Sequence, residues 1–381
     1  MIYFDNAATT YPKPEQVYKK MDNFYRDYGV NAGRGSYSAA KKATNLIDQT
    51  RNKLGKLLKI PHKSSIVFTP SATYAINLTL QGLNWNIGDV IYYSPFEHNA
   101  VLRTIYYLQN KYNIKLKQIP IKEKSLKFDL DKLKYEFNIH RPKMTIVSQV
   151  SNVTGLISPV EKIKKLTQKY NSKILVDGAQ GAGIIPIDLK NIDYYVWAGH
   201  KTLYGPMGVG GMVINENAEK PEPLIYGGTG TQSKKRNMPK NLPYKYEPGT
   251  NNIIAIAGLN ASIDWIAKLG STIIRNKEYE LTNFAIDKLR NFMDLKIYIP
   301  ENNEKHTSII SISVKGYKPF EIGKILDDKY NISVRTGLHC SPNTHEILNT
   351  MPNGTVRLSI SYFNNKEDIL DLEKAFEDLI F

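Results

Sequence analysis

The feature of this sequence that most restricts its fold is an alternation between short β-branched runs and longer amphipathic runs. The short runs with the length and composition of buried strands are Ile66–Thr69, Val90–Tyr93, Met144–Ser148 and Lys173–Asp177. Strands that alternate with helices form a mostly parallel sheet covered by helices, so the sequence predicts an α/β fold. Ligands of such sheets collect at the carboxyl ends of the strands, and residues directly after each strand are therefore the site candidates.

The pattern changes near residue 270, which indicates a second domain. A helical pattern over 276–293 is followed by strand candidates at 308–314, 332–335 and 356–361, by a helix over 318–328 and by a closing helix from residue 366. At 381 residues the chain exceeds the ~250 to 300 that one core supports. We expect a large domain over 15–265 and a small domain over 1–14 and 266–381. Residues 226–252 are too long for an idle connector, so we expect an active-site or dimer-contact loop there.

The charge balance bears on possible partners. The net charge is +15 and the pI is about 9.4, but the lysines are spread along helical stretches such as 161–166, which is typical of solvated surface. The excess favours an acidic protein partner over nucleic acid. No apolar stretch approaches ~20 residues and the N-terminus lacks the pattern of a signal peptide, so a cytoplasmic location without membrane contact is the default expectation. A single cysteine excludes an intrachain disulfide and argues against a metal site.

That cysteine, Cys340, lies in a turn-rich segment between Arg335 and Pro342, directly after His339. A neighbouring cation lowers the pKa of a thiol from about 8.5 and makes it a nucleophile. Cys340 is therefore a candidate catalytic residue. Judged by the count alone, a lone cysteine is more often an incidental unpaired one.

A glycine-rich motif over 198–211 contains Lys201, and Asp177 stands 24 residues earlier at the end of a predicted strand. A lysine that forms a Schiff base must be held rigidly, and glycines let the backbone approach a bulky ring closely. A buried aspartate needs a cationic partner, which the protonated pyridine nitrogen of pyridoxal 5'-phosphate would provide. The alternatives are a surface lysine in a loop and an aspartate that caps the next helix.

Three further segments follow predicted strands in the same order. Thr69–Thr73 opens a helical run and offers amides and hydroxyls to a phosphate, although a plain helix cap explains it equally well. His98 could stack on a ring and pass protons, and Asn152 could offer its amide to a ring hydroxyl or a carboxylate. A lone histidine is more often structural, but together these segments indicate a pyridoxal-phosphate site.

The sequence resembles the class V, fold-type I pyridoxal-phosphate enzymes, and within them the cysteine desulfurases of the class II, SUF-like kind. The similarity runs from Tyr3–Thr10 to Arg357–Asn364, and its most specific part is Val334–Cys340. Only 17 positions separate Cys340 from Arg357, which resembles the short cysteine loop of class II. The resemblance implies a large domain with a mostly parallel seven-stranded sheet and a smaller α+β C-terminal domain.

The resemblance also implies roles for individual residues at the cofactor. Lys201 would hold pyridoxal phosphate covalently and later move the substrate α-proton. Asp177 would pair with the pyridine nitrogen, Gln180 would bond the ring oxygen and His98 would stack on the ring. The phosphate would be held by Ala72, Thr73 and His200, and by Thr250 of a neighbouring subunit, which implies a homodimer.

The implied substrate site contains Arg357 as the clamp for the carboxylate, assisted by Asn152, with Asn31, Arg335 and Ala7 nearby. Asn31 belongs to the stretch 31–35, which matches the family's N-terminal active-site segment. The sequence departs from the family pattern at Ala198, where a phosphate hydroxyl is missing, and at Tyr37, Ser71 and Tyr74, where histidine, glycine and glutamate are usual.

The implied activity is removal of sulfur from L-cysteine, which leaves L-alanine and a persulfide on Cys340 for an acceptor protein. Selenocysteine lyase is a close alternative, and a class V aminotransferase, epimerase or lyase with an incidental cysteine is a more distant one. A nucleic-acid-associated or regulatory protein on a retired enzyme fold is opposed by the intact Lys201 and Asp177. The acceptor and its pathway, whether iron–sulfur cluster assembly, tRNA thiolation or another use of sulfur, stay open.

Overall fold

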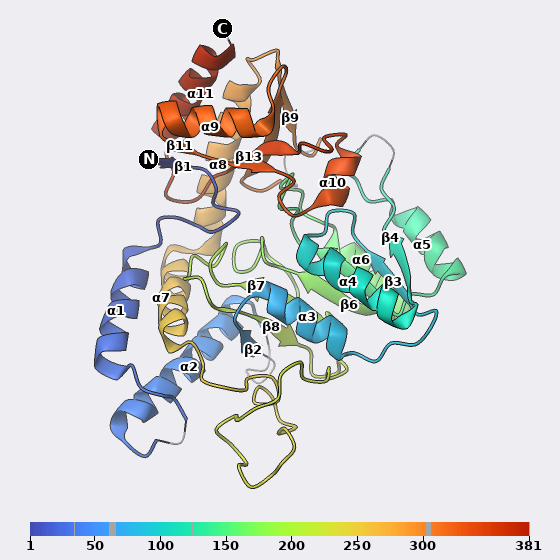
Figure 1. Cartoon of the computed structure of the whole chain (residues 1–381), viewed down its shortest axis with the longest axis vertical. Coiled ribbons are helices and arrows are strands. Elements are labelled where there is room, and N and C mark those ends of the chain that lie inside the picture. Colours follow the sequence, from blue (N-terminus) through green and yellow to red (C-terminus); the bar gives the residue numbers. More distant parts are fainter. Residues whose placement is uncertain (34, 61–65, 123–124, 302–305, 381) are drawn as a thin grey trace.

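A seven-stranded sheet forms the centre of the larger part of the molecule (Figure 1). The computed structural model describes residues 1–33, 35–60, 66–122, 125–301 and 306–380. In spatial order the strands are β2 (Ile66–Thr69), β8 (Gly210–Ile214), β7 (Tyr194–Ala198), β6 (Lys173–Asp177), β5 (Met144–Ser148), β3 (Val90–Tyr93) and β4 (Lys115–Gln118). Only β8 runs antiparallel to its neighbours. The predicted mostly parallel seven-stranded sheet is confirmed, and its four predicted strands have the expected bounds.

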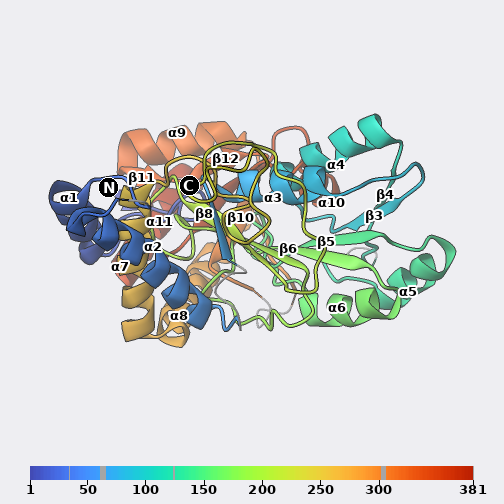
Figure 2. The same cartoon turned by 90° about the horizontal axis from the view of Figure 1, so that it is seen from below.

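Helices cover both faces of this sheet (Figures 1 and 2). On one face lie α3 (Ala72–Gly82) and α4 (Asn99–Tyr112), and on the other lie α2 (Ser38–Leu57), α5 (Leu130–Ile139), α6 (Val160–Lys169) and α7 (Ile253–Leu269). Strand β7 shows the consequence for the sequence: Tyr194 and Val196 enter one core, while Tyr195 and Trp197 enter the other. A strand buried on both faces reads as a continuous apolar run.

The chain turns sharply between the two parts of the molecule. Helix α1 (Glu15–Tyr28) packs with α2 and α7, and α7 is bent by 81° from α8 (Ser271–Leu289). Gly270, with φ of 93°, ends α7 and lets α8 begin at Ser271 rather than at the expected residue 276. Among the described residues no single helix is long and apolar enough to cross a membrane, and only the bent pair α7 and α8 passes that test together. The division of the chain at residue 265 stays a prediction.

The smaller part contains an antiparallel sheet in the order β12 (Arg335–Gly337), β13 (Thr355–Ser359), β10 (Ile309–Val314) and β9 (Leu295–Tyr298). Its helices are α9 (Pro319–Tyr330), α10 (Pro342–Ile347) and α11 (Lys366–Ile380). The single strand expected over 332–335 is divided, because β11 (Ile332–Ser333) pairs with β1 (Ile2–Tyr3) whereas β12 pairs with β13. Residues 226–252 contain no helix or strand.

Candidate active site

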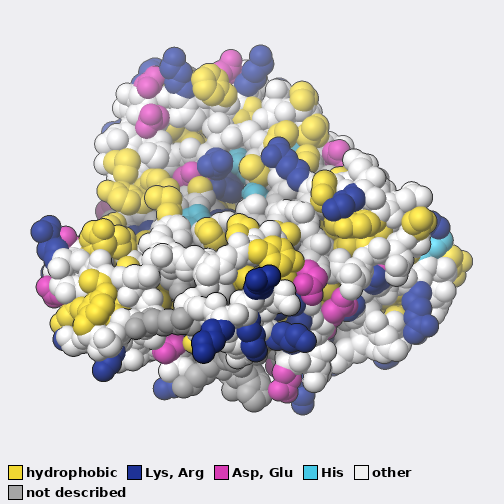
Figure 3. Space-filling model, turned by 60° about the horizontal axis from the view of Figure 1, so that its bottom comes forward, with side chains coloured by type: hydrophobic (Ala, Val, Ile, Leu, Met, Phe, Trp, Pro, Cys, Tyr) yellow, Lys and Arg dark blue, Asp and Glu magenta, His cyan; other side chains and the backbone are white. Residues whose placement is uncertain are grey.

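A cavity opens at the carboxyl ends of the central strands and at the start of α3. It collects eight of the predicted cofactor residues, namely Ala72, Thr73, His98, Asn152, Asp177, Gln180, His200 and Lys201. They follow strands β2, β3, β5, β6 and β7, so the parallel order of the strands brings them together. Figure 3 shows basic and histidine side chains gathered in the recess between the two parts of the molecule.

At one end of the cavity lies the buried carboxylate of Asp177. It is the last residue of β6, and its Oδ1 accepts a hydrogen bond of 2.9 Å from the backbone N–H of Ala179. Burial raises the pKa of Asp177, and the nearby charge of Lys201 opposes that rise. Among the described residues no cation forms an ion pair with this carboxylate, so a cation bound in the cavity would stabilise its charged form.

Lys201 lies in the loop that follows β7. Burial of the amine lowers its pKa to about 8, Arg357 and Arg335 act in the same direction, and Asp177 opposes them. The loop is fixed on both sides of the lysine, because Thr10 N–H donates to the carbonyl of His200 at 3.0 Å and Tyr204 N–H donates to that of Lys201 at 2.8 Å. A rigidly held amine that is partly neutral near neutral pH is suited to covalent chemistry with a carbonyl.

The two histidines of the cavity are neutral at neutral pH. Burial lowers the pKa of His98 to about 4, with Lys201 and Arg357 adding to the effect. Nδ1 of His98 accepts from the backbone N–H of Ala100 at 3.0 Å, so the ring proton is on Nε2. Burial likewise lowers the pKa of His200 to about 4, and its buried Nδ1 has no partner within the described structure.

The beginning of α3 also lines the cavity. Ser71 caps this helix through its Oγ, which accepts from Tyr74 N–H at 3.2 Å, and Ala72 and Thr73 form the first turn. A Cβ added at Gly210 would lie 2.8 Å from backbone atoms of Ser71 and Ala72, which explains the glycine at that position. A helix N-terminus attracts anions and the buried Asp177 favours a cation, so the cavity suits a ligand that carries both an anionic group and a cationic ring.

Gln180 and Asn152 make contacts that sequence reasoning did not foresee. The amide of Gln180 donates to the carbonyl of Ala7 at 2.7 Å. The amide of Asn152 donates to the carbonyl of His339 at 2.7 Å, directly before the cysteine. Both side chains line the cavity and also fix a segment from the other part of the molecule.

Two arginines of the small sheet lie close enough across the interface for their charges to act on Lys201, although neither lines the cavity. Arg357 is buried on β13, donates from Nη1 to the carbonyl of Asn152 at 3.0 Å and donates from Nη2 to Asp5 at 2.8 Å. Arg335 stands opposite it on β12 and is partly exposed. Three other predicted residues lie elsewhere: Ala7 lines an adjoining cavity, whereas Asn31 and Thr250 are exposed and do not line either one. Arg34 of the 31–35 stretch lies outside the described residues.

Cys340 is exposed at the start of an open groove. Both His339 and Cys340 have left-handed backbones, with φ of 49° and 57°. The carbonyl of Cys340 accepts from Asn99 N–H at 2.6 Å, and the hydroxyl of Ser341 donates to the carbonyl of Glu97 at 2.7 Å. The start of α4 therefore holds the cysteine segment. His98 lines both the cavity that contains Lys201 and the groove that contains Cys340, so the two spaces adjoin.

Sequence reasoning missed the buried acid Glu97. Its carboxylate accepts from the N–H of Ser148 at 2.5 Å and from the hydroxyl of Ser148 at 2.8 Å. Burial, and secondarily the charge of Asp177, raises the pKa of Glu97 to about 8. Its position directly after a strand and before His98 was the available signal.

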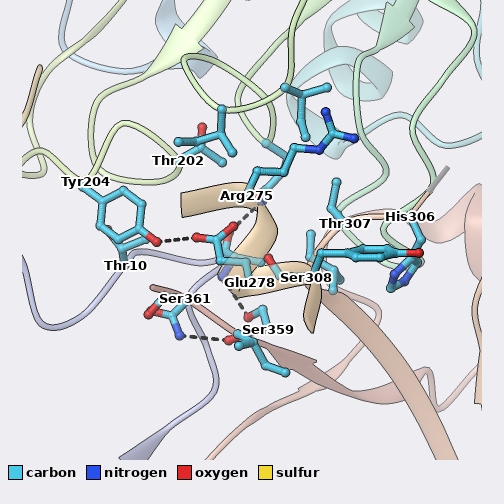
Figure 4. Close-up of a pocket in the computed structure, with 18 residues that line it drawn as sticks. Thr10, Thr202, Tyr204, Arg275, Glu278, His306, Thr307, Ser308, Ser359 and Ser361 are labelled. Atoms are coloured by element: carbon cyan, nitrogen blue, oxygen red, sulfur yellow. Dashed lines mark hydrogen bonds between the residues drawn. The ribbon is translucent and has the colours of Figure 1, made fainter. Parts of the chain in front are cut away.

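Sequence reasoning also missed Glu278, a residue of α8 that lines the adjoining cavity (Figure 4). The hydroxyl of Tyr204 donates to Glu278, and the backbone N–H of Tyr362 donates to the Tyr204 oxygen at 2.9 Å. Burial raises the pKa of Glu278 to about 7. Tyr204 thus joins the loop of Lys201 to two segments of the smaller part.

Comparison with known proteins shows the family to which the chain belongs. The family model described as Aminotransferase class-V matches residues 2–372, so the chain belongs to the class V aminotransferase family. Within it, the chain is similar to the cysteine desulfurase of Wigglesworthia glossinidia brevipalpis, with 31% identity over 98% of this chain and 92% of that protein. It is also 32% identical to a protein named "Probable cysteine desulfurase" from Pyrococcus abyssi, over 100% of this chain and 94% of the relative.

Solved structures agree in fold. The apo cysteine desulfurase from Thermococcus onnurineus NA1 superposes with a TM-score of 0.91 at 30% identity, over 100% of this chain and 94% of that one. The cysteine desulfurase CsdA from Escherichia coli, in an S-sulfonic acid form, gives a TM-score of 0.88 at 27% identity, over 100% and 95% of the two chains.

Proposed function

We propose that this protein is a pyridoxal-phosphate-dependent cysteine desulfurase that converts L-cysteine to L-alanine and carries the sulfur on Cys340 as a persulfide. One observation carries the proposal: His98 lines both the cavity of Lys201 and the groove of Cys340, so a buried amine and an exposed thiol serve adjoining spaces. A class V aminotransferase with an incidental cysteine gives no reason for the thiol to be placed there.

The residues of the cavity fit pyridoxal phosphate. Asp177 has no cationic partner among the described residues and would pair with the ring nitrogen, while the unpartnered Nδ1 of His200 and the first turn of α3 would hold the phosphate. Lys201 would bind the cofactor covalently. When bound, the cofactor supplies an electron sink for the bond broken at the substrate Cα.

Lys201 and Arg357 would prepare the substrate. The guanidinium of Arg357 would bind the carboxylate of L-cysteine, because an arginine fork matches a carboxylate in geometry and charge. With a pKa of about 8, a minor fraction of the Lys201 amine is neutral at neutral pH and able to take the α-proton, far more than for an ordinary lysine. His98, neutral and protonated on Nε2, would move a proton at the substrate sulfur.

Cys340 would complete the reaction. Its thiolate attacks the substrate sulfur, a sulfur–sulfur bond forms and the carbon–sulfur bond breaks. The electron pair of the broken bond stays with the three-carbon fragment, which takes up a proton at Cβ, regains a proton at Cα from Lys201 and leaves as L-alanine. The sulfur left on Cys340 is exposed, which supports delivery to an acceptor protein that docks at the groove.

A homodimer would complete the phosphate site. Thr250 is exposed, away from the cavity of its own chain, in a segment anchored by Glu247. That buried carboxylate is paired with Arg51 at 2.9 Å and accepts from Phe68 N–H at 2.7 Å. We propose that Thr250 reaches the phosphate of the neighbouring subunit. We also propose that the short segment around Cys340 is of the SUF-like kind. The acceptor protein would determine the pathway that uses the sulfur, such as iron–sulfur cluster assembly.

Cys340→Ser tests the proposal. The variant should keep the yellow absorbance of the bound cofactor but form no persulfide and almost no alanine from L-cysteine. Alanine is measured by chromatography and sulfur on Cys340 by mass spectrometry. Normal alanine and sulfide production by the variant would show that the thiol has no role. Comparison of L-cysteine with L-selenocysteine as substrates separates the desulfurase from a selenocysteine lyase.

A further inference from the structure

Two positive side chains stand directly opposite one another in the small sheet. Arg335 on β12 and Arg357 on β13 are register partners of an antiparallel pair. Like charges in such positions repel, and burial of Arg357, which lowers its pKa, makes its charge more costly still. The pair therefore needs a counter-ion within the protein, or the strands would lose stability.

Asp5 provides that counter-ion, one oxygen for each arginine. Oδ1 accepts from Nη2 of Arg357 at 2.8 Å, and Oδ2 lies 3.6 Å from Nη1 of Arg335. The contact with Arg357 is weakly screened, because the two side chains are 3% and 18% exposed. The Arg335 side chain is 46% exposed, so its contact with Asp5 is screened more strongly.

The backbone fixes Asp5 in this position. Asp5 forms a parallel bridge with Ser359, and the flanking residues are also bonded to Ser359. The N–H of Ser359 donates to the Phe4 carbonyl at 2.6 Å, and the Ala7 N–H donates to the Ser359 hydroxyl at 2.8 Å. These bonds fix the backbone of Asp5, and the hydrogen bond with Arg357 holds its carboxylate.

The remaining charge matches one carboxylate. Two guanidinium groups and one carboxylate leave a single positive charge, and Arg357 still has free donors, including an Nε–H without a partner in the described structure. We propose that Asp5 is a specificity-determining positioning residue, which holds Arg357 in place and restricts this site to ligands with one carboxylate. The inference rests on the proposed role of Arg357 as the substrate clamp.

Two substitutions separate position from charge. Asp5→Asn keeps an oxygen that can accept from Arg357 but removes the negative charge, whereas Asp5→Ala removes both. Asp328→Asn, on the exposed surface of α9, makes the same change in net charge away from the site and serves as the matched control. Acetate and malonate are the probes, with one and two carboxylates.

The holoenzyme and its variants are compared by the thermal shift that each probe produces and by competitive inhibition of L-cysteine turnover. In Asp5→Asn we expect malonate to bind about tenfold more tightly, because the negative charge that repels its second carboxylate has been removed. The affinity for acetate, which has no second carboxylate, should change by less than about threefold. Asp5→Ala should weaken both probes and raise the KM for L-cysteine about tenfold with a smaller change in kcat. Asp328→Asn should match the wild type.

An unchanged malonate-to-acetate ratio in Asp5→Asn would overturn the proposal, as would equal effects of Asp5→Asn and Asp328→Asn. The thermal shifts need no turnover. A wild type that binds the probes but makes no alanine would therefore refute the proposed activity alone.

Discussion

The two side chains that we propose to be reactive lie in opposite surroundings. Lys201 follows a central strand of the large sheet, and burial of its amine lowers its pKa to about 8. Cys340 lies in the smaller part and is exposed, and both it and the preceding His339 have left-handed backbones. The difference teaches that the two groups are prepared by different means: the amine by removal from water, and the thiol by placement at a surface that a second protein can reach.

The contacts that hold the lysine loop and the cysteine segment in place also differ. The lysine loop is held at the backbone on both sides of Lys201 and, through Tyr204, by the smaller part, whereas the cysteine segment is held across the interface by Asn99, Asn152 and Glu97. The lysine region should therefore respond to substitutions that change burial, and the cysteine region to those that change position.

The largest effect is expected from Lys201→Ala. Without the amine, no group in the cavity can hold the cofactor covalently or take the α-proton, so alanine formation should fall by about 10³-fold or more. Exchange of the substrate α-proton with deuterated solvent, followed by NMR, should fall equally, whereas Cys340→Ser should retain it. Wild-type exchange in Lys201→Ala would remove the distinction between the two regions.

An intermediate effect is expected from Glu278→Gln, and it appears in the pH dependence of stability. The carboxyl has a pKa of 4.5 when unfolded and about 7 when folded, so between these values the unfolded chain ionises first and stability falls as the pH rises. The loss attributable to this group is roughly 3 kcal/mol, complete slightly above pH 7.

Glu278→Gln should remove this part of the slope, so the free energy of unfolding of the variant relative to the wild type should increase from pH 5 to pH 8. Urea unfolding at several pH values measures it. Parallel wild-type and variant curves would mean that burial does not control this acid.

The smallest effect is expected from Ser341→Ala, which removes the buried bond to the Glu97 carbonyl. A single hydrogen bond contributes about 1 kcal/mol, so sulfur transfer to Cys340 should slow about fivefold. Alkylation of Cys340 by iodoacetamide should change as well, while α-proton exchange stays at the wild-type rate. An equal loss of exchange would show that the cysteine segment and the lysine region are not separable.

The sequence predicted four strands of the large sheet, β2, β3, β5 and β6, because each reads as a short, largely apolar run. It did not single out β7 and β8, although their residues are equally buried. Strand β4, at the sheet edge, was not predicted, since Lys115–Gln118 is polar and partly exposed. The helix at residue 271 was placed too late because the positive φ of Gly270 has no periodic signal. The strand at 332–335 was not divided because its two pairing partners, β1 and β13, are remote in sequence.

The cavity-lining residues were foreseen for a similar reason: strand order alone brings strand-end residues together. Asp5, Glu97 and Glu278 were missed because their roles come from partners 352, 51 and 74 positions away. No local pattern marks such a pair. The contacts of Gln180 and Asn152 with the N-terminal and cysteine segments were hidden for the same reason.

The bond between Asp5 and Arg357 also orders events during synthesis of the chain. The strands and loops that surround Lys201 have all left the ribosome well before β13 is made, so the lysine pocket can assemble first. The segment around Asp5 is translated at the outset, yet it must wait for one of the last strands before it finds its partner. The contact between Asp5 and Arg357, where we propose that the substrate carboxylate binds, can therefore form only after β13 has been made, later than the strands and loops around Lys201.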